Sequence, residues 1–317
     1  MIVTVTLNPS LDKALSVSRL QLGQVHRARL VRQDLGGKGI NVSRALRALG
    51  LESKIIGFVA GVTGEALRRE LCANGYDATL IEIAGETRQN ITLLDESSGV
   101  YTKINEPGAT PAPAQLAALM AEVERLACPG SLWAFCGSLP PGVPDALYAQ
   151  MIQLVRGRGG LAFLDSSGPA LRAGVAARPF GLKPNSEEAG ELVGRPLTDA
   201  EDHLAAARQL GVAGSAVVVI TRGDQGAAFN LWGDVLLAQL GPIKARSPVG
   251  AGDAALAGLL WAVLDRCGAD ETARRVVACG AAAALQEGSG VGERALVEQL
   301  LGQVRLSRPD PRREERE

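Results

Sequence analysis

Two hydrophobic patterns alternate along most of this chain. Amphipathic segments with helical spacing are followed by short apolar runs, which is typical of helices leading into buried strands. The run at 216–221 contains Val, Val, Val and Ile in succession, as in a strand that is covered on both faces. Repeated units of this kind predict an α/β fold with a mostly parallel sheet and helices on both sides. The expected strands are 2–7, 53–59, 79–83, 131–136, 161–165 and 216–221, and the expected helices are 41–49, 65–74, 113–127, 144–157 and 199–210; a hairpin at 227–232 and 234–240 precedes helices that continue to the end.

A different pattern occurs at 12–35 and 88–105, where the sequence is strand-like but half polar. Such segments do not fit the interior of a parallel sheet, so we predict two short hairpins that form a small β-sheet on the main body. The last residues, 307–317, are mostly Arg, Glu, Asp and Pro, and we expect them to be a disordered tail. The chain is therefore predicted to be one domain, 1–306, followed by that tail.

Composition excludes several classes of function. The 317 residues carry 33 basic and 34 acidic side chains, so the chain lacks the charge that nucleic acid or an anionic membrane would attract. Five scattered cysteines without a C-x-x-C pair indicate reduced thiols in the cytoplasm, and the N-terminus reads as a strand, not a signal peptide. The apolar run 254–264 is too short to span a bilayer. With only His26 and His203, a His-rich metal site is excluded and a Ser-His-Asp hydrolase is disfavoured.

The most informative motif is Gly250-Ala251-Gly252-Asp253, where a polar loop meets an apolar helical segment. A helix N-terminus attracts phosphate, and glycine allows the backbone to approach an anion closely. An acid at such a place fits a base that takes a proton from a hydroxyl beside the phosphate. Taken alone, the motif is more typical of an ordinary Asp helix cap after a glycine turn.

Several further segments carry candidate chemistry. Gly36 to Asn41 puts three glycines ahead of a helix, and Asp12 follows the first strand, where ligands of open α/β sheets bind. Lys183 to Glu188 and Thr221 to Gly226 each follow a strand-like run, and Glu188 could hold hydrated Mg²⁺ through water. Arg88 and Lys103 lie on the polar hairpins and could bind a substrate phosphate. Each segment by itself also fits a tight turn, an Asx turn, a capped helix start or a solvated strand.

Together these motifs resemble the phosphofructokinase-B family of ribokinase-like sugar kinases, from the N-terminus to about residue 305. The pairing of Gly36-Gly37-Lys38-Gly39-x-Asn41 with Gly250-Ala251-Gly252-Asp253 is specific to that family. The opening Asn8 to Asp12, the segment Lys183 to Glu188 and the run 136–142 resemble its hexose-phosphate kinase branch. The resemblance implies a three-layer sandwich with a mostly parallel central sheet and a β-sheet lid, which usually also forms a homodimer contact.

The resemblance also implies roles for individual residues. Asp253 would be the general base, and the backbone of 250–253 would form the anion hole. ATP and Mg²⁺ would be the cofactors. The implied catalytic set is Asp253, Gly250, Ala251 and Gly252; the substrate-binding set is Asp12, Gly37, Lys38, Asn41, Arg88, Lys103 and Ser138; the nucleotide-binding set is Lys183, Asn185, Thr221, Gly223, Gly226 and Gly288; and Glu188 is the metal-binding residue.

These roles predict ATP-dependent phosphorylation of a ketohexose monophosphate to the bisphosphate. Fructose 1-phosphate is the favoured acceptor, with tagatose 6-phosphate and fructose 6-phosphate as alternatives, because a basic residue at position 103 leaves the position of the substrate phosphate open. A sensor that kept the fold and lost the chemistry is a more distant alternative. A kinase of an unphosphorylated sugar or nucleoside is another.

Overall fold

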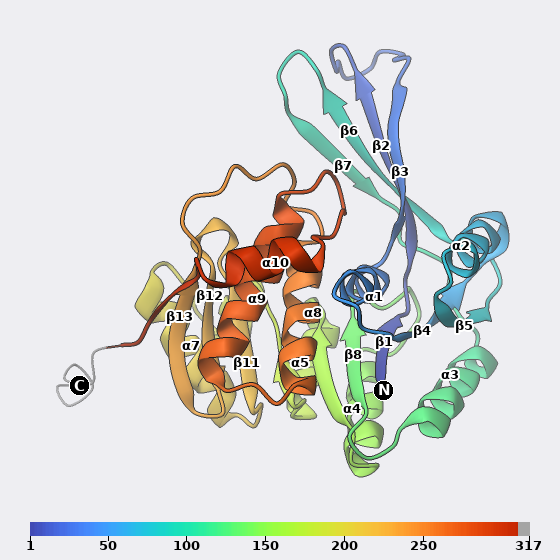
Figure 1. Ribbon diagram of the computed structural model, residues 1–317. Coiled ribbons are helices and arrows are strands. Elements are labelled where there is room, and N and C mark those ends of the chain that lie inside the picture. Colours follow the sequence, from blue (N-terminus) through green and yellow to red (C-terminus); the bar gives the residue numbers. More distant parts are fainter. Residues whose placement is uncertain (310–317) are drawn as a thin grey trace.

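Residues 1–309 are described by a computed structural model, in which helices surround a large twisted sheet and a small second sheet projects from one end (Figure 1). Within this range the large sheet has ten strands in the order β14-β13-β12-β11-β10-β9-β8-β1-β4-β5. The strands from β11 to β5 in that order run parallel to one another, whereas β12, β13 and β14 pair antiparallel. The strands are β1 (Ile2–Thr6), β4 (Lys54–Val59), β5 (Asp77–Glu82), β8 (Leu132–Cys136), β9 (Leu161–Asp165), β10 (Gly181–Leu182), β11 (Val217–Thr221), β12 (Ala227–Leu231), β13 (Asp234–Gln239) and β14 (Arg305–Ser307).

Helices cover both faces of the large sheet, so the body has three layers (Figure 1). One face carries α1 (Lys38–Ala48), α8 (Ala251–Leu264), α9 (Ala269–Ala284) and α10 (Arg294–Leu301). The other face carries α3 (Pro113–Leu126), α4 (Leu147–Gly157), α5 (Gly168–Ala176), α6 (Ser186–Val193) and α7 (Ala200–Val212). The helix α2 (Gly61–Ala73) packs with α1, β4 and the base of the small sheet.

Strand β11 shows why the apolar run at its centre is required. Val217 and Val219 belong to the hydrophobic cluster under α8 and α9, while Val218 and Ile220 belong to the cluster under α4 and α7. Successive side chains of a strand point to opposite faces, so a sheet with two helical layers needs apolar residues at every position. The predicted α/β fold with a mostly parallel sheet is therefore confirmed.

The small sheet is made of two hairpins, in the order β3-β2-β6-β7. Its strands are β2 (Ser10–Val17), β3 (Arg29–Gly36), β6 (Arg88–Asp95) and β7 (Tyr101–Asn105). Asp12, Asn90 and Asn105 occupy one row across β2, β6 and β7, so their side chains share a face. The neighbouring row of Lys13, Ile91 and Ile104 faces the opposite side. The predicted separate β-sheet is confirmed, and we call it the lid below.

Five local expectations need correction. The helix α5 and the two-residue strand β10 were not predicted, and α4 begins at Leu147 instead of residue 144. The expectation that only helices follow Asp253 is wrong, because β14 pairs antiparallel with β13. The structure is regular into the expected tail, since Ser307 lies in β14 and Arg308 forms ion pairs with Asp234 (2.7 Å) and Asp270. The remainder of that tail, 310–317, lies outside the described residues.

Candidate active site

The carboxyl ends of five parallel strands meet at one edge of the large sheet. Four of these strands end in Thr6 (β1), Cys136 (β8), Asp165 (β9) and Thr221 (β11). The fifth, β10, is followed directly by Lys183. In open α/β sheets this edge is where ligands bind. The lid rises above it, because only three residues separate the end of β1 from the start of β2.

A cavity of about 230 Å³ lies between this edge and the lid. A volume of that size suits a small polar ligand such as a sugar. Four of the predicted substrate-binding residues line it: Gly37, Lys38, Arg88 and Ser138. The remaining lining residues are Thr6, Asn8, Asn105, Cys136, Gly137 and Ser167.

Asp253 lies in the first turn of α8, with only 7% of its surface exposed. Gly250 caps this helix in the left-handed region, with φ 81°, which favours glycine. The amide Nδ2 of Asn41 donates a 2.8 Å hydrogen bond to Oδ2 of Asp253. Burial raises the pKa of the Asp253 carboxyl to about 6, and the charge of Asp165 adds to the rise; the Asn41 bond and the ammonium groups of Lys38 and Lys183 oppose it. A carboxylate of this kind is suited to accept a proton near neutral pH.

Asp165 is a buried acid at the site that the sequence analysis did not identify. It is 1% exposed, and its two oxygens contact Nζ of Lys38 at 2.7 Å and Nζ of Lys183 at 2.8 Å. Burial alone would raise the pKa of Asp165, but the charges of Lys183 and Lys38 hold it below its ordinary value. The charge of Asp165 in turn raises the pKa of Lys38. Asp165 therefore joins a predicted substrate-binding residue to a predicted nucleotide-binding residue.

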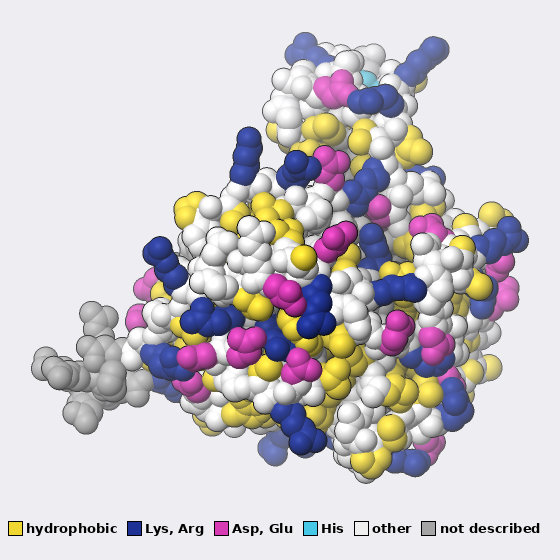
Figure 2. All heavy atoms as spheres, viewed as in Figure 1, with side chains coloured by type: hydrophobic (Ala, Val, Ile, Leu, Met, Phe, Trp, Pro, Cys, Tyr) yellow, Lys and Arg dark blue, Asp and Glu magenta, His cyan; other side chains and the backbone are white. Residues whose placement is uncertain are grey.

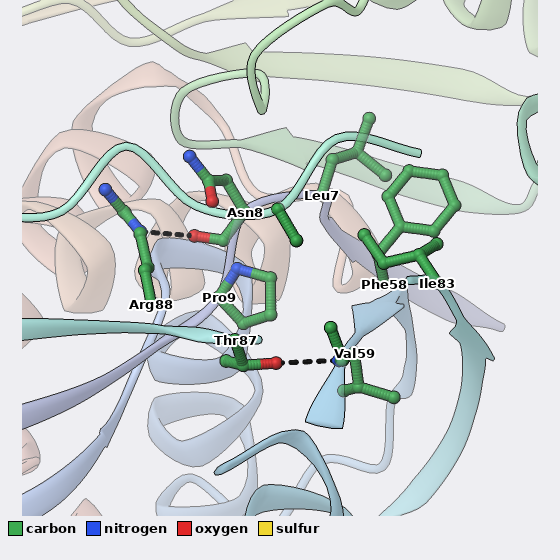
Figure 3. Close-up of a pocket in the computed structure, with 10 residues that line it drawn as sticks. Leu7, Asn8, Pro9, Phe58, Val59, Ile83, Thr87 and Arg88 are labelled. Atoms are coloured by element: carbon green, nitrogen blue, oxygen red, sulfur yellow. Dashed lines mark hydrogen bonds between the residues drawn. The ribbon is translucent and has the colours of Figure 1, made fainter. Parts of the chain in front are cut away.

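The base of the lid holds Asp12 and Arg88 in place. Oδ1 of Asp12 accepts hydrogen bonds from Ser10 Oγ (2.7 Å) and Asn90 Nδ2 (2.9 Å). Nε of Arg88 donates to the backbone oxygen of Asn8 at 3.2 Å, as drawn in Figure 3. Figure 3 also shows that Arg88 flanks a much smaller pocket of about 10 Å³, whose far wall includes Leu7, Phe58 and Ile83. The guanidinium therefore lies between an apolar wall and the polar cavity.

Lys103 differs from the other predicted substrate-binding residues. It lies on β7 opposite Thr92, two residues from Asn105 and farther out on the lid, and the whole of β7 is exposed. It is not among the residues that line the cavity of about 230 Å³. Its role as a phosphate contact stays a prediction.

Gly37 is the only residue between the lid strand β3 and the helix α1. Its φ of 126° lies in a region that residues with a Cβ rarely adopt, and a Cβ there would come within 2.7 Å of Cγ2 of Thr6. The next residues, Lys38 to Asn41, begin α1 and carry Asn41 toward Asp253. Glycine at position 37 is therefore required by both the turn and the close contact.

The predicted nucleotide-binding residues form a second group along the same edge. Asn185 caps α6 and pairs with Thr221 through a parallel bridge, while Glu188 completes a reciprocal capping box. Gly223 and Gly226 bound the short 3₁₀ turn after β11, both with positive φ. A Cβ at Gly226 would come within 2.1 Å of the backbone oxygen of Ala238, so this turn needs glycine.

Gly288 lies in a loop that the lid contacts. Arg32 of β3 donates hydrogen bonds to the backbone oxygen of Glu287 and to Ser289 Oγ (3.4 Å). Arg44 of α1 also donates to Ser289 Oγ, at 3.1 Å. A Cβ at Gly288 would overlap the guanidinium of Arg32, at 2.1 Å from its Cζ. The loop that contains Gly288, a predicted nucleotide-binding residue, is therefore held by hydrogen bonds to the lid and to α1.

The acidic side chains of the site are better suited to hold a cation through water than to coordinate it directly as a group. In the described part of the chain, no group of three or more His, Cys, Asp or Glu side chains is arranged to hold a metal. Asp165 is occupied by two lysines, and the cap of α6 uses Oε2 of the half-buried Glu188. Magnesium usually keeps several waters and binds through one or two carboxylates and the phosphates of its substrate. Glu188 is compatible with that mode.

Comparisons with known proteins identify the family. The profile described as "pfkB family carbohydrate kinase" matches residues 5–295. The chain belongs to the pfkB family. It is an ATP-dependent sugar kinase, and the resemblance inferred from the two glycine motifs is confirmed.

Curated members of the pfkB family are similar to this chain over most of its length. The 1-phosphofructokinase of Rhodobacter capsulatus is 36% identical over 278 residues, covering 87% of this chain and 88% of the relative. The 1-phosphofructokinase of Vibrio cholerae is 35% identical and covers 96% of both. Among solved structures, phosphofructokinase-2 from Escherichia coli superposes with a TM-score of 0.89 at 31% identity, covering 95% of this chain and 98% of the other.

As a pfkB kinase, this chain has several site residues that sequence reasoning missed. Asp165, Asn90 and Asn105 were not singled out, although each lies at or near the end of an expected strand. That position was an available signal only for Asp165, which ends a strand of the large sheet at the edge where ligands bind; Asn90 and Asn105 lie on the lid. Thr6 lines the cavity and was read only as part of the first strand. Within residues 1–309, no helix of this kinase is both long and apolar enough to cross a membrane.

Proposed function

We propose that this kinase transfers the γ-phosphoryl group of ATP to fructose 1-phosphate, giving fructose 1,6-bisphosphate. The observation that carries the proposal is the buried Asp253 at the N-terminus of α8, which Asn41 joins to α1, the helix whose first residue Lys38 lines the polar cavity with Arg88. Relatives that are 31–39% identical to this chain are named 1-phosphofructokinase, which supports the choice of acceptor.

Asp253 is the proposed general base. The attacking sugar hydroxyl gives its proton to the carboxylate as its oxygen forms a bond to the γ-phosphorus. The bond from that phosphorus to the β,γ-bridging oxygen breaks, and ADP leaves with the electron pair. A pKa of about 6 leaves the carboxylate ionised at neutral pH yet basic enough to share the proton in the transition state.

The first turn of α8 is the proposed anion hole. Gly250 caps the helix, and the backbone N–H groups of Ala251, Gly252 and Asp253 begin it. A helix of 14 residues presents partial positive charge at this end, which stabilises negative charge developing on the transferred phosphoryl group. The ammonium of Lys183 lies next to Gly252, because a Cβ on that glycine would be 3.4 Å from Nζ.

The sugar phosphate is proposed to bind in the cavity below the lid. Arg88 would offer a planar guanidinium for its phosphate and Lys38 a point charge, while Asp12, Asn41 and Ser138 would bind hydroxyls. Gly37 lets the backbone approach the sugar. Lys103 would add a further positive charge from the lid.

ATP is proposed to lie along the other half of the edge. The residues proposed to contact the nucleotide are Lys183, Asn185, Thr221, Gly223, Gly226 and Gly288. Mg²⁺, held through water by Glu188, would neutralise phosphate charge when it is bound. The carboxylate of Glu188 is oriented for this by the capping box with Asn185.

A kinetic comparison of acceptors tests the proposal. ADP release from the wild type is measured with fructose 1-phosphate, tagatose 6-phosphate, fructose 6-phosphate and the unphosphorylated sugars. We expect the highest kcat/KM with fructose 1-phosphate. Preference for fructose 6-phosphate would instead support the second candidate, 6-phosphofructokinase activity, which is favoured by the similarity to phosphofructokinase-2. Absence of ADP release with every sugar would support a sensor and reject the kinase assignment for this chain.

The lid is also proposed to form a homodimer. Its outer row includes Ile104, and its edge and tip include Leu22, Val25, Leu30 and Tyr101, all exposed by more than half. Figure 2 shows hydrophobic side chains on the lid among arginines and lysines. Exposed apolar rows on a small sheet favour pairing with another chain. A solved form of Escherichia coli phosphofructokinase-2 is described as tetrameric and inhibited, so a larger assembly is the alternative.

A further inference from the structure

Asp165 occupies a place in the site to which no role has yet been given. It ends β9 at the centre of the binding edge, and it is 1% exposed. One of its oxygens contacts Lys38 at 2.7 Å and the other contacts Lys183 at 2.8 Å. A buried carboxylate is costly unless it is paired, and here each oxygen has its own cationic partner.

The two lysines belong to opposite halves of the site. Lys38 begins α1 and lines the sugar cavity. Lys183 precedes α6 and lies beside Gly252 at the N-terminus of α8. Their flexible side chains come from segments 145 positions apart, and both ammonium groups meet at one carboxylate. Asp165 therefore connects the sugar side of the site to the nucleotide side.

The charges around Asp253 are balanced through this arrangement. With both lysines protonated and both acids ionised, the four groups Lys38, Lys183, Asp165 and Asp253 carry no net charge. When Asp253 takes up a proton, the group becomes net positive. That change would occur as negative charge moves through the anion hole, where a net positive surrounding is stabilising.

We propose that Asp165 is a positioning residue that holds Lys38 toward the sugar phosphate and Lys183 toward the nucleotide, and so couples the binding of the two substrates. The inference rests on the proposed function for the identity of the sugar. Asp165 makes no contact with substrate in this account. Without its carboxylate, each ammonium keeps its charge and loses the partner that fixes its place.

Asp165→Asn tests the proposal, because it keeps the shape of the side chain and removes the charge. We expect the KM for fructose 1-phosphate and the KM for ATP both to rise at least about tenfold, as for loss of a positioned charged hydrogen bond. Lys38→Met should raise mainly the sugar KM, and Lys183→Met mainly the ATP KM. In the Asp165→Asn background, Lys38→Met should add less than about twofold to the sugar KM, since the lysine is already displaced.

Asp77→Asn is the matched control. Asp77 pairs with Lys54 at the same 2.7 Å, but at the beginning of β5 and β4, away from the binding edge. It should leave both KM values within about twofold. If Asp165→Asn lowers only the melting temperature and leaves both KM values unchanged, Asp165 is merely structural and the proposal is rejected. A rise in only one KM, or fully additive effects with Lys38→Met, rejects it as well.

A charge-matched variant covers the case in which Asp165→Asn does not fold. Asp165→Asn combined with Lys183→Met keeps the net charge of the native Lys38–Asp165–Lys183 group. Its sugar KM should exceed that of Lys183→Met alone by at least about tenfold; equal values reject the proposal. Turnover of the wild type separates the two hypotheses. An inactive wild type rejects the proposed function. An active wild type whose variants have unchanged KM values rejects only the role of Asp165. Calorimetric binding of fructose 1-phosphate and of a non-hydrolysable ATP analogue gives the same comparison without turnover.

Discussion

Nδ2 of Asn41 lies 2.8 Å from Oδ2 of Asp253, although 212 positions separate the two residues along the chain. The bond joins the first turn of α1 to the first turn of α8, so the two glycine motifs meet at a single carboxylate. It stabilises the ionised form of an acid whose pKa burial would otherwise raise further. The proposed base is therefore tuned by a residue of the proposed sugar site.

Replacing the proposed base should abolish turnover and leave the nucleotide site intact. For Asp253→Asn we expect kcat to fall by about 10²–10⁴, the range for loss of a general base. The ATP analogue should bind with nearly unchanged affinity, because the side chain contacts Asn41 and faces the acceptor side. Single-turnover kinetics and calorimetry measure the two quantities. A variant with near-wild-type kcat contradicts the assignment of the base.

The same carboxylate should set the acid limb of the pH profile. With the pKa of Asp253 raised to about 6, kcat/KM should fall about tenfold per pH unit below that value, since the protonated acid cannot act as a base. Asn41→Leu removes the hydrogen bond that lowers this pKa, so its acid limb should shift to higher pH. A limb that stays in place in Asn41→Leu contradicts the coupling.

Asp253 should also cost the fold some stability at neutral pH. Its pKa rises from 3.8 in the unfolded chain to about 6, so the native state binds more protons between these values and the free energy of unfolding falls as pH rises through that window. Above pH 6 the full penalty is present, on the order of 3 kcal/mol. In urea unfolding at pH 8, Asp253→Asn should have a higher free energy of unfolding than the wild type. At pH 5 this difference should be about half as large. An unchanged midpoint at pH 8 contradicts the raised pKa.

Arg88 and Lys103 should differ in their effect on the acceptor. Arg88 lines the cavity and is fixed by the backbone oxygen of Asn8, whereas Lys103 is exposed on β7. We expect Arg88→Gln to raise the KM for fructose 1-phosphate about 10- to 100-fold, and Lys103→Gln to raise it less than about threefold. Steady-state kinetics at saturating ATP gives both values. No change in either variant would favour an unphosphorylated acceptor.

Gly37→Ala should damage both stability and sugar binding. The alanine must adopt φ near 126° and place its Cβ within 2.7 Å of Cγ2 of Thr6, for which we expect a loss of about 3 kcal/mol. Gly99→Ala is the control, because Gly99 also has positive φ, at 70°, but has open space around it. It should cost about 1 kcal/mol. Equal losses of unfolding free energy would show that the contact with Thr6 is unimportant.

A charge on the outer row of the lid should break the proposed dimer. Ile104 is 54% exposed on β7, and Ile104→Lys would bury a charge in the interface. Light scattering during size-exclusion chromatography should then give a monomer mass where the wild type gives a dimer. Val212→Lys is the control, since Val212 is 85% exposed at the end of α7, away from the lid. A wild type that is monomeric at all concentrations contradicts the dimer.

Periodicity predicted the body of this fold because its signals are local. The Val-Val-Val-Ile run of β11 and the polar hairpins of the lid each carry their burial pattern within a few residues. The strand β10 was missed because a strand of two residues has no periodicity. The strand β14 was missed because it pairs with β13, and the next residue, Arg308, pairs with acids that are distant in the sequence. Local pattern could not supply those partners.

The site was predictable to the extent that its residues lie in contiguous motifs. Asp253 and Asn41 each belong to a glycine motif, and the structure brings them into contact. Asp165 ends an ordinary apolar strand, and only the side chains of Lys38 and Lys183, which arrive from other elements, give it a role. Its pairing is a product of tertiary structure, so sequence spacing alone could not predict it.

The first hairpin of the lid, β2 and β3, is joined to the body by very short connections. Leu7, Asn8 and Pro9 separate β1 from β2, and Gly37 alone separates β3 from α1. Asn8 and Gly37 both line the cavity of about 230 Å³ below the lid, so these connections are part of the cavity wall. A chimaera that exchanged residues 10–36 between relatives would therefore have both of its splice points at this cavity. This hairpin cannot be inherited as an independent module, and its shape and the proposed acceptor site must diverge together in evolution.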